Sequence, residues 1–104
     1  MRRPSSRPRP HTCHVPGCNA ACPPAYLMCR THWFMVPAKQ QQRVNDTVWK
    51  RRNQVDASWA DWWRAKTDAI ATVLRAIQWR DEAAIVKFAV RGELVATLLE
   101  ESET

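Results

Sequence analysis

The sequence has little glycine and no long apolar stretch. Only Gly17 and Gly92 occur among the 104 residues, which argues against a β-rich fold with many tight turns. No run of about 18 apolar residues is present, so we expect no membrane-spanning helix. The basic start, MRRPSSRPRP, is not followed by the apolar stretch of a signal peptide. We therefore expect a cytoplasmic protein whose thiols are kept reduced.

The chain also lacks the residues of common catalytic motifs. All three histidines precede Trp33, so the rest of the sequence offers none to a Ser-His-Asp relay or a metal-dependent nuclease. There is no glycine-rich loop to hold a phosphate group, and the His-x-Glu and Pro-Cys-x-x-Cys motifs of zinc deaminases are absent. We expect a non-catalytic protein with no small-molecule substrate.

Acidic residues are nearly missing from the first half. Residues 1–55 carry ten Lys/Arg and a single acid, Asp46, whereas residues 56–104 carry six Lys/Arg and nine acids. Such a basic segment favours an anionic partner, DNA or RNA, although a charged surface can also serve solubility alone. The residues that we expect to contact phosphates are Arg2, Arg3, Arg7, Arg9, Lys50, Arg51 and Arg52. No feature of the sequence predicts recognition of particular nucleic-acid bases, because the chain lacks the ligand spacing and second histidine of a ββα zinc finger.

Proline and cysteine divide the N-terminal part into two segments. Residues 1–10 contain three prolines and four arginines and nothing that a core could bury, so they predict a disordered basic arm. Residues 11–36 contain every cysteine and histidine together with three further prolines, which predicts a compact knuckle of loops.

Helical periodicity dominates the next segment. Residues 37–79 predict a helical hairpin packed on the knuckle, with Pro37 in the first turn of the first helix. Ser58-x-x-Asp61 is typical of a capping box, and apolar residues at helical spacing follow it to about residue 78. The expected fold class is mainly α: a small zinc knuckle module followed by two to three helices.

The C-terminal segment, residues 80–104, is ambiguous. Its apolar residues fit one face of a third helix, and alanine together with the acidic start favours this reading. A β-hairpin remains an alternative for this segment, because Gly92 lies in the middle of the helical pattern.

Six tryptophans exceed what a core of this size requires. Trp59, Trp62 and Trp63 lie at the start of the second predicted helix, where we expect them mainly in the core. Trp62 and Trp63 are adjacent and point about 100° apart on a helix, so one of them can reach the surface. An exposed tryptophan beside arginine is typical of protein interfaces. Trp62 and Trp63 are therefore candidate contacts for a protein partner.

Two close-spaced ligand couples stand out, Cys13-x4-Cys18 and Cys29-x2-His32. Zinc prefers four nitrogen or sulfur ligands in a tetrahedron, and each short couple supplies two corners at little cost in loop entropy. We expect these four residues to bind one structural Zn²⁺ and to leave no open position for catalysis.

Other pairings of the cysteines stay open. Cys22 could replace Cys18, and His14 or His11 could replace a cysteine. Gly17 favours Cys18, because it suits the tight turn that this choice places inside the chelate. Cys22 would then be a small buried apolar side chain. The even number of cysteines also permits disulfides.

The segments CHVPGCNAACPP and CRTHWFMVP resemble a group of small, largely uncharacterised phage and prophage proteins. The shared pattern is a cysteine, a Pro-Gly-Cys turn, prolines, then Cys-x-x-His-Trp and a Leu/Val-Pro pair that opens a helix. The resemblance covers about residues 13–75, whereas Cys22 and residues 80–104 depart from the pattern. It implies metal ligands at Cys13, Cys18, Cys29 and His32, and structural positions for Trp33 and Pro37. It implies a viral origin but no particular activity.

The sequence therefore predicts a non-catalytic, zinc-stabilised binding module of phage or prophage type. Its expected target is nucleic acid or a nucleic-acid-associated host assembly, reached through the basic N-terminal half. The alternative is a small inhibitor or modulator that docks on a host protein through its tryptophan-rich and acidic C-terminal surfaces. No membrane partner is expected.

Overall fold

The computed structural model describes residues 11–22, 26–53 and 58–103. The arm predicted for residues 1–10 lies outside them. In chain order the described elements are the strands β1 (His11–Thr12) and β2 (Ala21–Cys22) and the helices α1 (Arg30–Trp33), α2 (Ala38–Arg52), α3 (Trp59–Ala76) and α4 (Glu82–Glu103). This part of the chain is mainly α, as the sequence predicts. None of its helices is long and apolar enough to cross a membrane.

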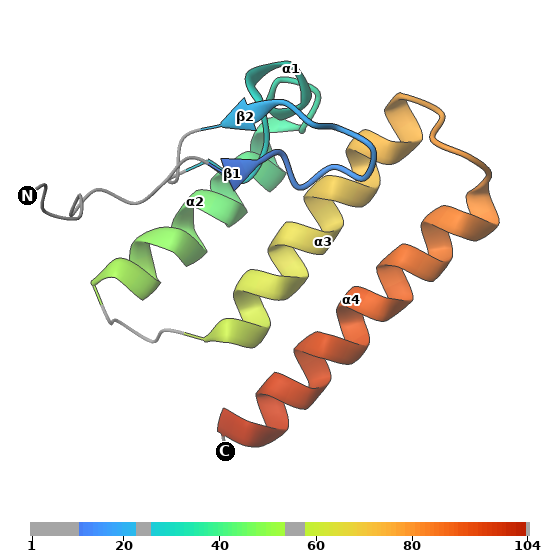
Figure 1. Cartoon of the computed structure of the whole chain (residues 1–104). Helices are drawn as coiled ribbons and strands as arrows, with labels where there is room; N and C mark the ends of the chain where they lie inside the picture. The colour runs from blue at the N-terminus through green and yellow to red at the C-terminus, as the bar shows by residue number, and fades with distance from the viewer. Residues whose placement is uncertain (1–10, 23–25, 54–57, 104) are drawn as a thin grey trace, which may run out of the picture.

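The three long helices form a layer with α3 in the middle (Figure 1). α2 packs on one side of α3 and α4 on the other. The two strands pair antiparallel, with His11 opposite Cys22 and Thr12 opposite Ala21. Together with α1 they lie over one end of α2 and α3 (Figure 1). The predicted knuckle is thus a short β-hairpin followed by a single helical turn.

One apolar core joins the knuckle to the long helices. The knuckle contributes Cys13, Val15, Leu27 and Met28, and the helices contribute Val44, Ala69, Ile70, Val73, Leu74 and Ile85. Val44 is the one fully buried residue of α2, which agrees with the narrow apolar stripe of its sequence. Because the knuckle and the long helices share this core, each of them fixes the position of the other.

Ser58 caps α3, as the sequence predicts. Its Oγ accepts a hydrogen bond from the backbone N–H of Asp61 at 3.2 Å. Glu103, at the far end of α4, reaches the same turn and accepts from the Trp59 N–H at 2.7 Å and from the Ser58 hydroxyl at 3.0 Å. A carboxylate is favoured there because the first turn of a helix has unpaired N–H groups. These bonds fasten the end of α4 to the start of α3.

Residues Glu82–Glu103 form one helix, not the β-hairpin that the sequence left open. Gly92 is buried in this helix opposite Thr67 of α3. A Cβ at position 92 would lie 2.5 Å from Cγ2 and 2.8 Å from Cβ of Thr67, far inside normal contact distance. Gly92 therefore permits close packing of two helices rather than a turn.

The turn between α3 and α4 begins earlier than the sequence predicts. Gln78 and Arg80 adopt positive φ angles of 55° and 52°, in the left-handed region. The backbone N–H of Trp79 donates to the carbonyl of Leu74 at 2.9 Å, which closes the end of α3. The left-handed residues end the helix although the apolar pattern continues to Ile77.

Candidate metal centre

The β-hairpin positions the first ligand couple. The N–H of Cys13 donates to the carbonyl of Ala20 at 2.8 Å, and the N–H of Cys18 donates to the carbonyl of Val15 at 3.0 Å. Gly17 has a φ of 84° in the tight turn between them, a conformation that side chains disfavour. The turn folds the chain back, so that the Cys13 and Cys18 thiols face the same point.

The short helix α1 positions the second couple. Cys29 precedes its first residue, and His32 lies in its single turn. The backbone N–H of Trp33 donates to the carbonyl of Cys29 at 2.9 Å, which closes that turn. The carbonyl of Trp33 in turn accepts from the Gln41 side chain at 2.8 Å, which ties α1 to the start of α2.

The four predicted ligands come together. The Nδ1 atom of His32 lies 3.5 Å from Cys13 Sγ and 3.2 Å from Cys29 Sγ, and the Cys18 and Cys29 sulfurs are 3.9 Å apart. All four ligand atoms lie within 4.8 Å of one another. Tetrahedral bonds of about 2.3 Å to sulfur and about 2.0 Å to nitrogen would place sulfurs about 3.8 Å apart and sulfur and nitrogen about 3.5 Å apart. The cluster therefore has the donors and the dimensions to hold a metal ion.

Burial governs the ionisation of these thiols. It raises the pKa of the Cys13 thiol to about 11, so that this thiol keeps its proton at neutral pH. Burial acts in the same direction on Cys29, but hydrogen bonds with the His32 backbone and the neighbouring thiols outweigh it and lower the Cys29 pKa. Metal ions bind the thiolate form, so a metal that enters this cluster must displace protons.

The remaining cysteine and histidines lie beside the cluster, not in it. Cys22 is 3% exposed, and its sulfur lies 3.7 Å from Nδ1 of His11. The rings of His11 and His14 are 4.9 Å apart. No second group of three or more metal-binding side chains is found among the described residues. All four cysteines, each of which the structure describes, are free, so the disulfide alternative is not formed.

The three basic residues at the end of α2 point in different directions. Lys50 lines a groove on α2 together with Lys39 and Arg43. The Arg51 guanidinium lies over the ring of Trp59, and Arg52 lines a separate cavity. Successive residues of a helix are about 100° apart, which explains the spread. The structure therefore does not gather them into one patch.

The other predicted nucleic-acid contacts cannot be placed, because Arg2, Arg3, Arg7 and Arg9 lie outside the described residues.

The tryptophans of α3 form a row of edge-to-face contacts. The ring of Trp62 lies 6.0 Å from that of Trp59 and 5.8 Å from that of Trp63. Trp62 and Trp63 are half-buried, whereas Trp59 is 47% exposed. The Nζ of Lys66 lies 3.7 Å from the centre of the Trp63 ring. The most accessible tryptophan of the row is therefore Trp59, which sequence reasoning assigned to the core.

The sequence did not predict an exposed apolar stripe on α4. Val86, Val90, Leu94 and Leu98 follow one another at four-residue intervals along α4 and are 45–65% exposed. They lie on the face opposite Gly92 and Ala96, which are buried. The sequence does contain this second apolar stripe at helical spacing. It could not be recognised while a β-hairpin was still an alternative for residues 80–104, because the four residues share one face only in a single helix.

Comparisons with known proteins identify no relative. No family model, no curated protein and no solved structure matches the chain. The resemblance to phage and prophage proteins therefore stays a prediction.

Proposed function

We propose that this protein is a non-catalytic, zinc-stabilised binding module that acts on nucleic acid or on a nucleic-acid-associated assembly. We place it in the cytoplasm, where its thiols would stay reduced, and in a phage or prophage, as the sequence resemblance implies. Three thiolates and one imidazole form a donor set typical of structural zinc. With four protein ligands the coordination sphere is complete, which leaves no position for a substrate or an activated water.

The observation that carries the nucleic-acid hypothesis is the separation of charge across the helical layer. α2 holds five Lys/Arg and one acid, whereas α4 holds two Lys/Arg and five glutamates. The two helices lie on opposite sides of α3 (Figure 1). The basic side includes Lys39, Arg43 and Lys50 in one groove, which Asp46 and Asp61 also line. Arg43 pairs with Asp68 at 2.6 Å, so the two lysines are the cations of this groove without a hydrogen-bond or ion-pair partner among the described residues. Such a surface attracts phosphates without reading sequence.

The sequence before the described residues adds four arginines. The described chain starts at His11, which lines a cavity together with α2 residues, and Arg9 is two residues away along the sequence. An arginine-rich arm strengthens binding to the phosphate backbone.

Salt dependence tests this function. The affinity of the full chain for a nucleic acid should fall steeply between low salt and about 0.5 M, because bound counterions are released. Lys39→Gln with Lys50→Gln should weaken binding and reduce the salt slope by about 1.5, whereas Lys87→Gln with Arg91→Gln on α4 removes the same charge and should change little. Binding that ignores salt, the α2 substitutions and deletion of residues 1–10 would contradict the proposal.

A second candidate function is docking on a host protein as an inhibitor or modulator. It is favoured by the apolar stripe of Val86, Val90, Leu94 and Leu98, which is exposed along an acidic helix. Contiguous exposed apolar side chains of this kind often mark a protein interface. A complex of this kind should survive nuclease treatment in an affinity purification and should be lost in Leu94→Gln with Leu98→Gln. A complex that disappears with nuclease speaks for the first function instead.

A further inference from the structure

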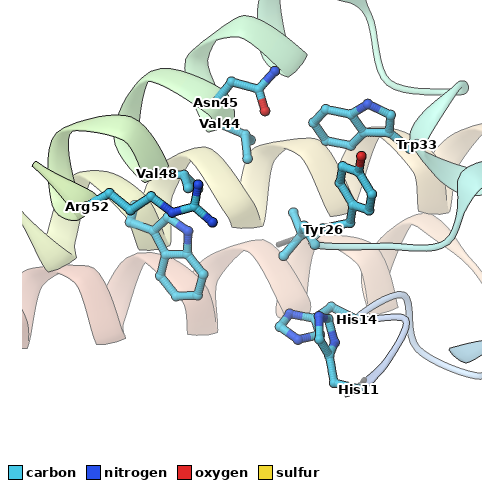
Figure 2. A pocket seen from close by; sticks show the side chains of 10 residues that line it. His11, His14, Tyr26, Trp33, Val44, Asn45, Val48 and Arg52 are labelled. Atoms are coloured by element: carbon cyan, nitrogen blue, oxygen red, sulfur yellow. The ribbon is translucent and has the colours of Figure 1, made fainter. Parts of the chain in front are cut away.

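A cavity of about 260 Å³ lies between the β-hairpin, the end of α1, α2 and α3 (Figure 2). It is smaller than the pockets of about 300–1,000 Å³ that enclose drug-sized ligands and cofactors. Its volume fits one flat ring system. The sequence did not reveal it, because its walls come from four separate segments of the chain.

Aromatic and apolar side chains form most of the wall. Tyr26 and Trp33 face the cavity from the knuckle and Val48 from α2 (Figure 2). Trp62 lines it from α3. Aromatic rings around a narrow space favour a planar partner that can stack on them.

The polar groups of the cavity are cationic or neutral. Arg52 and Asn45 reach it from α2, and His11 and His14 lie across from them (Figure 2). None of the described residues that line the cavity carries a carboxylate. Among the described residues, neither the Arg52 guanidinium nor the Asn45 amide has a hydrogen-bond or ion-pair partner. Both are therefore available to a ligand that carries an anionic group and a hydrogen-bonding edge.

We infer that this cavity binds one unpaired base of a single-stranded nucleic acid. The base stacks on the aromatic walls, the Asn45 amide bonds to its polar edge, and Arg52 contacts the adjoining phosphate. A paired base cannot enter, because its edge is engaged within a duplex and its faces are stacked. The inference rests on the proposed function and gives it a substrate class, single strands in preference to duplexes.

The test compares a short single-stranded oligonucleotide with a duplex of the same length, both titrated with the full chain. The single strand should bind more tightly. Trp62→Leu should reduce its affinity about 5- to 150-fold, the range expected for loss of one stacked base. Asn45→Ala, an exposed position that should not disturb folding, should reduce it about 2- to 10-fold. Neither variant should change duplex affinity.

The neighbouring arginine provides a matched control. Arg52→Gln and Arg51→Gln remove the same charge one residue apart, but only Arg52 lines the cavity. Arg52→Gln should reduce the preference for single strands, whereas Arg51→Gln should leave it unchanged. Ultraviolet crosslinking should attach the base to Tyr26, Trp33 or Trp62, as located by mass spectrometry.

The outcomes distinguish failure of the base-binding cavity from failure of the proposed nucleic-acid function. Equal affinity for single strands and duplexes, with cavity variants that bind like the original protein, would overturn the base pocket and leave the proposed function standing. Failure of the full chain to bind any nucleic acid at low salt would overturn both.

Discussion

Gln78 is held in a backbone conformation that suits glycine. Its φ of 55° lies in the left-handed region, where an L-residue with a Cβ is strained by about 1–2 kcal/mol. A left-handed backbone conformation is needed at position 78 because the turn brings α4 back antiparallel to α3 (Figure 1). The exposed side chain makes no contact that offsets this strain among the described residues.

We therefore expect Gln78→Gly to stabilise the protein. Glycine adopts positive φ without steric cost, and the gain should be about 1 kcal/mol, or about 4–8 °C in Tm. Thermal and urea unfolding measure it. Gln78→Val is the control and should destabilise the fold, since β-branched residues tolerate this region least. A glycine variant less stable than the original would contradict the conformation of this turn.

At the scale of elements, α3 and α4 are joined by close packing in their middle and by ionic contacts along one edge. Arg64 lies 3.0 Å from Glu93 and 2.7 Å from Glu100. Such solvent-exposed pairs add little to stability. The contact between Gly92 and Thr67 is therefore the feature that most strictly limits the size of the side chains that α3 and α4 can have where they meet.

The substitution Gly92→Ala distinguishes packing from helix propensity. Propensity alone predicts stabilisation of about 1 kcal/mol, because alanine is the best helix former. The clash with Thr67 predicts destabilisation of about 1–3 kcal/mol, and we expect it to prevail. Urea unfolding of Gly92→Ala, Thr67→Ala and the double variant should show partial recovery in the double variant. Additive effects of the two substitutions would refute the close contact.

Local signals predicted several elements well. The Ser58 cap and the periodicity of α3 depend on residues near each other in the chain, and they were read correctly. The sequence also predicted which four residues form the candidate metal centre, because each couple is short and zinc-binding spacing is specific. The two-residue strands were not predicted, since two residues give no periodic pattern.

Features that depend on distant residues could not be predicted. Gly92 resembles a helix breaker until Thr67 is known to lie opposite it. The exposure of Trp59 and the cavity around Asn45 depend on how α2 and the knuckle pack on α3. Sequence periodicity gives the direction of a side chain on its helix but not which neighbour occupies that direction.

At the scale of the whole molecule, the candidate metal centre is packed into the core that joins the knuckle to the helices. Cys13 and Val15 are buried in the core that Val44 and Ile70 also form. A chain of this length buries a limited apolar area, so a metal that closes the knuckle stabilises the entire fold. Loss of the metal should therefore expose one end of α2 and α3 as well.

Metal analysis of the purified protein should give about one zinc per chain. Cys29→Ala should lose the metal and lower Tm by at least about 10 °C, and a strong chelator should act similarly on the original protein. Cys22→Ala is the matched control: its sulfur is buried but lies outside the cluster, so it should keep the zinc and lose only about 1 kcal/mol. Loss of metal in Cys22→Ala but not in Cys29→Ala would refute the ligand assignment.

The protonation of Cys13 makes metal uptake depend on pH in a defined direction. Its pKa of about 11 keeps this thiol protonated across the neutral range, whereas the bound form is the thiolate. Binding therefore releases at least one proton, and the affinity should fall at least about tenfold for each pH unit of acidification. Competition with a chromogenic chelator between about pH 6.5 and 8 measures the slope. An affinity that does not change with pH would mean that the thiols are not the ligands. Cys22→Ala should retain the slope of the original protein, because its thiol takes no part in the exchange of protons for metal.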